Sequence, residues 1–170
     1  MKRALFVIDM QNVIVGKNHA NFIKYDREKI ISAVNEKISK YESENVFYIC
    51  KIMKNNFISK LSPIKAYDGS VEAQIAEEVN VVSGNIIKKY KGDAFSNPEL
   101  KKMLTDKNIS EIEITGLDGG GCVALTALGA IREGFKVIMA QNAIATANFN
   151  IKRAEKLNNK LKSLGAEFII

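Results

Sequence analysis

EIEITGLDGGGCVALTALGAI, residues 111–131, is the most informative segment of the chain. A β-rich apolar run breaks at Gly116, three more glycines follow, and from Cys122 onward apolar residues recur at spacings of three and four. The pattern predicts a strand, a tight turn and a helix that begins at Cys122. The free N–H groups and positive dipole end of a helix N-terminus favour a thiolate, and they could hold an oxyanion formed when sulfur attacks a carbonyl.

The same residues allow a structural interpretation of Cys122. Free cysteine is among the most buried residue types, and glycine before a helix can be simple loop geometry. The segment alone leaves both a catalytic role and a packing role open for Cys122. The rest of the chain has to decide between them.

Strand and helix patterns alternate along the whole chain. Further strands are predicted at 4–8, 46–49, 85–87, 136–140 and 167–170, and further helices at 26–41, 71–78, 98–104 and 152–163. Residues 16–26 and 51–70 show no clear period and are predicted loops, the second lying over the functional face. The alternation predicts one domain, residues 1–170, with a three-layer α/β/α fold around a parallel sheet.

Composition narrows the function classes. The chain has 170 residues, of which 46% are hydrophobic and 26% charged, as in ordinary globular domains. Its apolar runs are far shorter than the roughly 18 residues of a membrane span, so no membrane partner is expected. The net charge of +6 comes from scattered lysines with few aromatic residues between them, which argues against nucleic-acid binding. Two cysteines make no disulfide framework, so a cytoplasmic location is expected.

Two more chemical groups are predicted at the same edge of the sheet as Cys122. Asp9 ends the first predicted strand, and Lys88 and Lys89 follow the third. Open α/β sheets place their ligands at the carboxyl ends of the strands. A carboxylate there could take the thiol proton, and an ammonium could favour the thiolate and orient a carbonyl. Singly, Asp9 is consistent with a backbone cap and either lysine with a solvated residue, but the combination with Cys122 favours a catalytic site.

With these residues in order, the sequence resembles the isochorismatase-like cysteine hydrolases over nearly its whole length. Three motifs carry the resemblance: Asp9-x-Gln11 after an apolar strand, Lys89 six residues before Phe95, and Gly116 six residues before Cys122-Val123. The second spacing selects Lys89 rather than its neighbour as the family's lysine.

The resemblance implies a fold and a reaction. The fold is a Rossmann-like domain with a six-stranded parallel sheet, assembled as a homo-oligomer, dimer or tetramer. The reaction is hydrolysis of a small-molecule substrate with a C–N bond, an amide, ureide or carbamoyl compound. In the implied triad Cys122 attacks to form a thioester, Asp9 acts as general base and later as acid, and Lys89 positions the groups and stabilises charge.

The resemblance also implies details of the loop before the cysteine. It places a cis peptide bond at Leu117–Asp118 and an oxyanion hole at the N–H groups of Asp118 and Cys122. The substrate pocket is expected to include Gln11, Phe95 and Gly121.

Departures from the family pattern refine these expectations. The isochorismatases proper lack a cysteine at the position of Cys122, so hydrolysis of a vinyl ether is disfavoured. Nicotinamidases carry an Asp/His metal cluster, part of it after the second strand, where this chain has Lys51-Ile52-Met53-Lys54. His19 is the one histidine in the sequence. We therefore expect neither a metal nor another cofactor.

Two alternatives remain open. Asp118 places a second carboxylate near the thiol, where it would either disfavour the thiolate or select a cationic substrate, and a glycine-rich loop would hold an oxyanion less firmly. Both points allow a catalytically silent binding or scaffold protein of the same fold. A third hypothesis is a mononucleotide- or phosphate-binding module that uses Gly119, Gly120, Gly121 and the start of the following helix as an anion nest.

Overall fold

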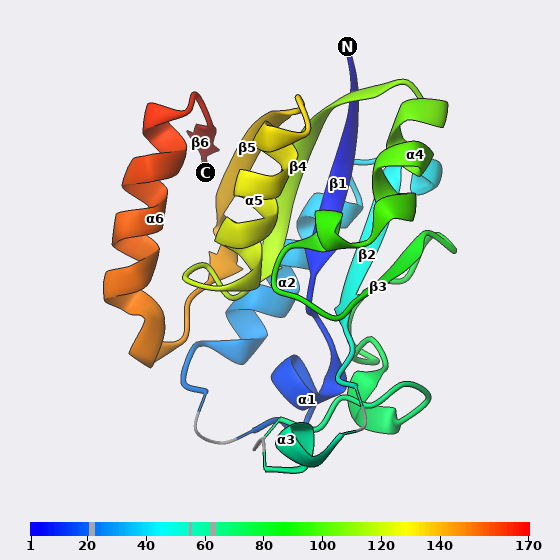
Figure 1. The fold of residues 1–170 in the computed structure, drawn as a ribbon, viewed down its shortest axis with the longest axis vertical. Helices are drawn as coiled ribbons and strands as arrows, with labels where there is room; N and C mark the ends of the chain where they lie inside the picture. The colour runs from blue at the N-terminus through cyan, green and yellow to red at the C-terminus, as the bar shows by residue number, and fades with distance from the viewer. Residues whose placement is uncertain (21–22, 55, 62–63) are drawn as a thin grey trace.

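A six-stranded parallel sheet with strand order β3-β2-β1-β4-β5-β6 forms the centre of the computed structural model (Figure 1). The structure describes residues 1–20, 23–54, 56–61 and 64–170. The strands are β1 (Lys2–Ile8), β2 (Val46–Lys51), β3 (Ile86–Lys89), β4 (Ile109–Leu117), β5 (Lys136–Ala145) and β6 (Glu167–Ile169).

Helices cover both faces of this sheet, so the predicted three-layer α/β/α fold is confirmed. One face carries α2 (Arg27–Ile38), and the other carries α4 (Pro98–Asp106), α5 (Cys122–Arg132) and α6 (Ile151–Ser163) (Figure 1). Two short helices, α1 (Asn12–Val15) and α3 (Phe57–Lys60), lie beyond the carboxyl ends of the strands. The short 3-10 turns are η1 (Ser43–Asn45), η2 (Val71–Ala73), η3 (Ala94–Ser96) and η4 (Asn148–Asn150). None of the described helices has the length and apolar character that crossing a membrane requires.

Side chains at the helix starts explain where two of the helices begin. The Asp26 carboxylate accepts a hydrogen bond from the backbone N–H of Lys29 at 3.0 Å, which caps α2. Asn97 caps α4 in the same way, with Pro98 at the first helical position. Both starts agree with the sequence prediction.

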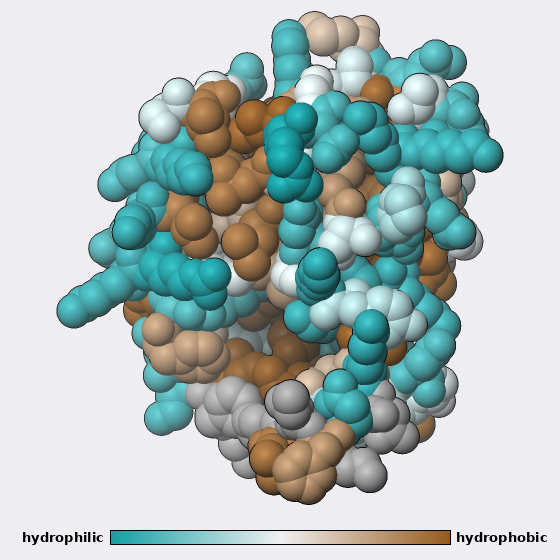
Figure 2. Space-filling model, in the orientation of Figure 1, coloured by the Kyte–Doolittle hydropathy of each residue, from teal (hydrophilic) through white to brown (hydrophobic). Residues whose placement is uncertain are grey.

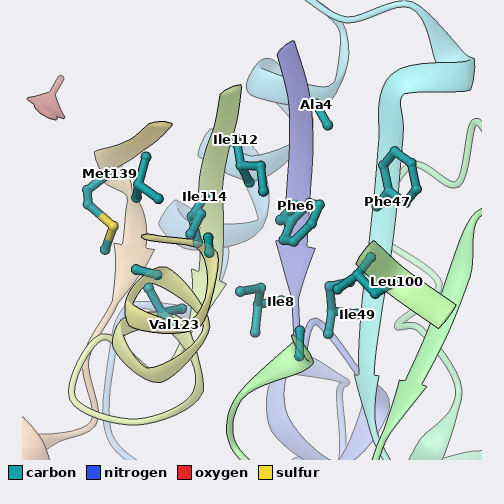
Figure 3. Packing of buried hydrophobic residues seen from close by; sticks show 14 of the residues in the cluster. Ala4, Phe6, Ile8, Phe47, Ile49, Leu100, Ile112, Ile114, Val123 and Met139 are labelled. Atoms are coloured by element: carbon teal, nitrogen blue, oxygen red, sulfur yellow. The ribbon is translucent and has the colours of Figure 1, made fainter. Parts of the chain in front are cut away.

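The central strand β1 is buried on both faces, as its uninterrupted apolar run predicts. Ala4, Phe6 and Ile8 face α4 and α5, and Figure 3 shows them beside side chains from β2, β4 and α5. Leu5 and Val7 face the opposite way and pack in the cluster under α2. The carboxyl end of β1 is therefore held firmly from both sides.

Gly116 lets β4 approach β1 closely at this end of the sheet. Its φ is +105°, and a Cβ atom there would lie 2.1 Å from the backbone oxygen of Ile8. Glycine is the residue that accommodates both conditions. The strand does not end at Gly116, as the sequence suggested, but continues to Leu117.

Tertiary contacts override local pattern between β2 and β3. The helix predicted at 71–78 is wrong, because only the turn η2 forms there. The next residues pair with the chain after β1: the N–H of Ala76 donates to Met10 O at 3.0 Å, and the N–H of Asn12 donates to Gln74 O at 2.8 Å. The region predicted as a loop, 51–70, contains α3. Five residues of the predicted loops lie outside the described residues: Asn21, Phe22, Asn55, Ser62 and Pro63.

Candidate active site

The order of the strands creates a crevice beside β1. The chain passes from β1 to β2 on one side, and β4 later pairs with β1 on the other side. The connections that follow β1 and β4 therefore run in opposite directions, and ligands bind at such a switch point. Asp9 directly follows β1, Cys122 begins the helix after β4, and Lys89 ends β3. The structure thus brings together the three residues that the sequence singled out.

Lys89 and Asp9 form a buried ion pair. The Lys89 ammonium donates to Asp9 Oδ2 at 3.0 Å, and the two side chains are 0% and 8% exposed. Burial lowers the pKa of Lys89, but the charge of Asp9 and the interaction with Cys122 outweigh that effect and raise it overall. Lys89 therefore remains a cation that holds one oxygen of Asp9.

The second oxygen of Asp9 has no such partner. Asp9 Oδ1 is buried and accepts no hydrogen bond from any described residue. The backbone of Asp9 adopts a φ of +52°, and its N–H donates to Ile49 O at 2.8 Å. A buried carboxylate oxygen without a donor is a ready acceptor for a proton.

The thiol of Cys122 is the group beside this carboxylate. Burial raises the pKa of Cys122 from its ordinary value of 9.0 to about 12, and the charge of Asp9 adds to the rise while Lys89 opposes it. The expectation that the helix start favours a resting thiolate is therefore wrong, because desolvation and Asp9 outweigh the favourable charges. Cys122 thus rests as a thiol under the influence of the Asp9 carboxylate, which is a group able to take its proton.

Asp118 organises the loop before Cys122. The peptide bond Leu117–Asp118 is cis, as the resemblance implied. Asp118 Oδ1 accepts from the N–H of Gly120 at 2.8 Å, and Oδ2 accepts from the side-chain amide of Asn150 at 2.5 Å. Both oxygens are thus engaged within the chain, and the charges that act on the Cys122 thiol are those of Asp9 and Lys89.

The glycine run is tightly packed rather than loose. A Cβ atom on Gly120 would lie 2.6 Å from the backbone oxygen of Asn150, so this close approach requires glycine. The N–H of Gly119 donates to Ala145 O at 2.9 Å, and that of Gly121 donates to Asp118 O at 2.8 Å. With the Gly120 N–H also engaged, the three glycine N–H groups are used within the chain, and an anion nest would have to rely on the helix start.

Two other N–H groups of the loop point to a different use. Within the described residues, the backbone N–H groups of Asp118 and Cys122 have no hydrogen-bond acceptor. The N–H of Val123 donates to Asp118 O at 3.1 Å and closes the turn around them. These two donors remain available to a ligand.

A cavity of about 350 Å³ opens above these groups. Figure 2 shows a recess in the lower half of the face viewed there, with hydrophobic surface inside it and hydrophilic groups along part of its rim. Its polar lining residues are Asp9, Gln11, Lys51, Asp118, Cys122 and Asn150, and its apolar ones include Val13, Ile14, Ile23, Met53, Ile64 and Phe149. A small cavity with apolar walls and a few polar groups is typical of a small-molecule site.

The three expected pocket residues have different positions. Gln11 and Gly121 line the cavity. Phe95 does not, because η3 directs its ring into the core, where it lies 6.2 Å from the ring of Phe6 and 5.7 Å from that of Phe135. The expectation for Phe95 is corrected accordingly. Sequence reasoning also missed Lys51, which a predicted sheet register could have brought to this edge.

Two known proteins share part of their sequence with this chain. N-carbamoylsarcosine amidase from Arthrobacter sp. is 26% identical over 155 aligned positions, which cover 83% of this chain and 58% of that protein. Streptothricin hydrolase from Streptomyces noursei is 33% identical over 61 residues, covering 36% of this chain and 24% of that protein. The chain thus matches less than two thirds of the length of either relative.

Solved structures agree over almost the full chain. Nicotinamidase PncA from Bacillus subtilis has a TM-score of 0.83 at 23% identity, with 100% of both chains covered. Pyrazinamidase of Pyrococcus horikoshii in complex with zinc has a TM-score of 0.84 at 23% identity, with 99% of both chains covered. N-carbamoylsarcosine amidase from Thermoplasma acidophilum has a TM-score of 0.79 at 20% identity, covering 99% of this chain and 95% of the other. At these identities the likeness shows a common fold.

The zinc in one of these structures raises the question of a metal here. Among the described residues, no group of three or more His, Cys, Asp or Glu side chains is placed to hold a metal ion. Of the cavity carboxylates, Asp9 is paired with Lys89 and Asp118 with Asn150 and a backbone N–H. Zinc sites need three or four such ligands around one point, so these residues do not fit zinc.

A family model also covers nearly the whole chain. The isochorismatase domain model matches residues 3–169. The match extends over all six strands and includes Asp9, Lys89 and Cys122. The chain belongs to the isochorismatase family.

Proposed function

We propose that this chain is a cysteine hydrolase that cleaves a small C–N substrate, an amide, ureide or carbamoyl compound, through a thioester. The observation that carries the proposal is the buried, unpartnered Asp9 Oδ1 beside the protonated Cys122 thiol, on the wall of a cavity. The names of the relatives, an N-carbamoylsarcosine amidase and a nicotinamidase, support the same class of bond.

The proposed first half-reaction uses Asp9 as a base. As the sulfur of Cys122 attacks the carbonyl carbon, its proton moves to Asp9 Oδ1, and the N–H groups of Asp118 and Cys122 hold the oxyanion. Lys89 stays charged and keeps Asp9 in place. Asp9 then gives the proton to the leaving nitrogen, the C–N bond breaks, and ammonia or an amine departs from the thioester.

The second half-reaction reverses the role of Asp9. A water molecule attacks the thioester carbon while Asp9 takes one of its protons. The C–S bond breaks, Asp9 returns the proton to the sulfur, and the acid product leaves. The raised pKa of the Cys122 thiol suits this cycle, because the sulfur is charged only while Asp9 carries its proton.

The experiment is release of ammonia from N-carbamoylsarcosine, nicotinamide and succinamate. We expect Cys122→Ala to lower turnover of any accepted substrate by at least about 10³-fold, because it removes the nucleophile. Cys50→Ala is the matched control, since Cys50 is a buried free cysteine that is not among the residues lining the cavity. We also propose metal independence, so a chelator should leave the rate unchanged. Unchanged turnover in Cys122→Ala would refute the proposal.

A silent binding protein of the same fold is the second candidate. The observation that favours it is the raised pKa of Cys122, because a resting thiol is a weak nucleophile. Intact-mass measurement during turnover separates the two. An acyl adduct on Cys122 identifies the hydrolase, whereas ligand binding without any adduct or turnover identifies the silent protein.

Two further features belong to the same proposal. A homo-oligomer, dimer or tetramer, is supported by large exposed apolar side chains such as Phe57 and Leu61, which are 78% and 75% exposed. Light scattering after gel filtration measures the assembly. A cytoplasmic location is supported by the free thiols of Cys50 and Cys122.

A further inference from the structure

We propose that Lys51 makes the cavity selective for substrates that carry a carboxylate in addition to the scissile C–N bond. The inference rests on the proposed hydrolase function for its reaction. Its recognition step is independent of turnover and can be tested by binding alone.

Outside the proposed catalytic residues Asp9 and Cys122, the polar side chains Gln11 and Asp118 of the cavity are already engaged. The Gln11 amide donates to Lys51 O at 3.0 Å and to Ala73 O at 2.7 Å, and its oxygen accepts from the Lys51 N–H at 2.8 Å. Both oxygens of Asp118 accept hydrogen bonds from within the chain. Few polar side-chain groups of the cavity wall are therefore free to form hydrogen bonds with a ligand.

Lys51 differs from the lysines next to it in space. Lys89, its register partner on β3, pairs with Asp9, and Lys88 pairs with Asp68. Among the described residues, no carboxylate pairs with Lys51. Lys51 therefore brings an uncompensated positive charge to the cavity wall.

The backbone of Lys51 is held in a fixed position. The Gln11 amide bonds both the N–H and the carbonyl of this residue, and the N–H of Ile52 donates to Lys89 O at 2.8 Å. A charged group that starts from a rigid element loses less freedom when it binds a ligand. The backbone of Lys51 is therefore preorganised for ligand binding.

The walls around Lys51 strengthen its preference for an anion. Val13, Ile14, Met53 and Phe149 line the same cavity, and an apolar surrounding strengthens the attraction between opposite charges. The volume of about 350 Å³ admits only a small ligand. The chemistry that fits is a short aliphatic body with an amide or carbamoyl group at one end and a carboxylate at the other.

The test compares acids with their neutral esters. Succinamate, glutaramate and adipamate place a carboxylate at increasing distance from a primary amide, and the methyl ester of each removes the charge. We expect kcat/KM for the best acid to exceed that of its ester by about ten-fold, the effect of one charge-assisted hydrogen bond. In Lys51→Met this ratio should fall to about one, and in Lys51→Arg it should stay high.

A matched control and a binding assay complete the test. Lys54→Met makes the same change at an exposed lysine that lies over the Tyr90 ring, outside the cavity lining, and should keep the wild-type ratio. Calorimetric binding of the same acids to Cys122→Ala protein needs no turnover. Acid binding that depends on Lys51 without hydrolysis by the wild type would support Lys51 and refute the hydrolase.

Two outcomes would overturn the inference while leaving the hydrolase in place. One is equal turnover of acids and esters by the wild-type protein. The other is an acid preference that persists in Lys51→Met. Failure of every acid to bind Cys122→Ala protein would also overturn it.

Discussion

Two buried lysine–carboxylate pairs in the described part of the chain differ in what surrounds them. Lys89 lies 3.0 Å from Asp9 at the carboxyl end of the sheet, and Lys37 of α2 lies 3.1 Å from Glu113 of β4. The side chains of the four residues are all less than a tenth exposed, at 0%, 8%, 9% and 4%. As ion pairs alone the two are nearly equivalent.

The neighbours of each carboxylate separate them. Glu113 Oε2 accepts from the Tyr41 hydroxyl at 2.6 Å, and the Arg3 guanidinium lies 3.6 Å away. Burial and Glu113 raise the pKa of Tyr41, so that phenol keeps its proton. Among the described residues, each carboxylate keeps one buried oxygen without a hydrogen bond, Asp9 Oδ1 and Glu113 Oε1, and each lines a cavity. The neighbour of Asp9, however, is the Cys122 thiol, whereas that of Glu113 is a phenol that keeps its proton. A buried ion pair thus indicates a candidate active site only when a nucleophile and space for a substrate adjoin it.

The largest expected effect comes from neutralising each carboxylate in turn. Asp9→Asn should lower kcat/KM by at least about 10²-fold, because it removes the general base. Glu113→Gln should change kcat/KM by less than about three-fold, because it lies outside the lining of the cavity at Cys122. The measurement is the rate of ammonia release from the best amide substrate.

Stability provides the control for that comparison. Each variant leaves a buried lysine opposite an uncharged amide, so each should lose about 3–5 kcal/mol of unfolding free energy. Urea unfolding measures the loss, and assays should run where both variants are folded. Equal activity losses in the two variants would mean that the pairs do not differ in function.

A smaller and opposite effect is expected for alkylation of Cys122 by iodoacetamide. Asp9→Asn removes a charge that raises the pKa of Cys122 and keeps the ammonium of Lys89, so the pKa should fall. Each unit of that fall increases the thiolate fraction at pH 8 by about ten-fold, and the alkylation rate by about three-fold, because a less basic thiolate is a weaker nucleophile. Lys89→Met should slow the reaction, and Glu113→Gln should not alter it. An Asp9→Asn protein that is alkylated more slowly than wild type would contradict this electrostatic account.

The smallest effect is the pH dependence of stability. Folding raises the pKa of Cys122 from 9.0 to about 12, so the unfolded chain loses this proton first as the pH rises. The contribution of the Cys122 proton to the free energy of unfolding is fully present below pH 9. It is lost between pH 9 and 12, at no more than about 1.4 kcal/mol per pH unit. Cys122→Ala should make the unfolding free energy less dependent on pH from pH 9 upward. Tyr41→Phe should do so only above pH 10, because the ordinary pKa of Tyr41 is 10.0. Unfolding at several pH values checks both.

Much of the fold follows from local pattern. The apolar run of β1 predicts a strand buried on both faces, and the three- and four-residue spacing after Cys122 predicts α5. Side chains alternate along β3, so Lys89 is buried and Lys88 is exposed. The choice of Lys89 over Lys88 comes from the motif spacing of the resembling family and not from local pattern. A strongly periodic segment keeps its predicted structure because burial of its apolar face in the core stabilises that structure.

Other features depend on contacts between distant residues, so local pattern does not predict them. Residues 71–78 have helical spacing, but the N–H of Ala76 donates a hydrogen bond to Met10 O instead of to a carbonyl within a helix. Asp118 is engaged by Asn150, which lies 32 positions later in the chain. The raised pKa of Cys122 results from burial, which the glycine loop and helix start do not reveal. Lys51 reaches the cavity only through the register of β2.

The side chain of Gln11 has a consequence for the evolution of this cavity. Its amide donates to the carbonyl of residue 51 and accepts from the N–H of the same residue. Neither hydrogen bond depends on the side chain at position 51. Substitutions at position 51 can therefore accumulate without disturbing the framework that carries Asp9. Divergent descendants of such a protein could exchange an acidic substrate for a neutral or basic one in a single mutational step, and a designer could do the same.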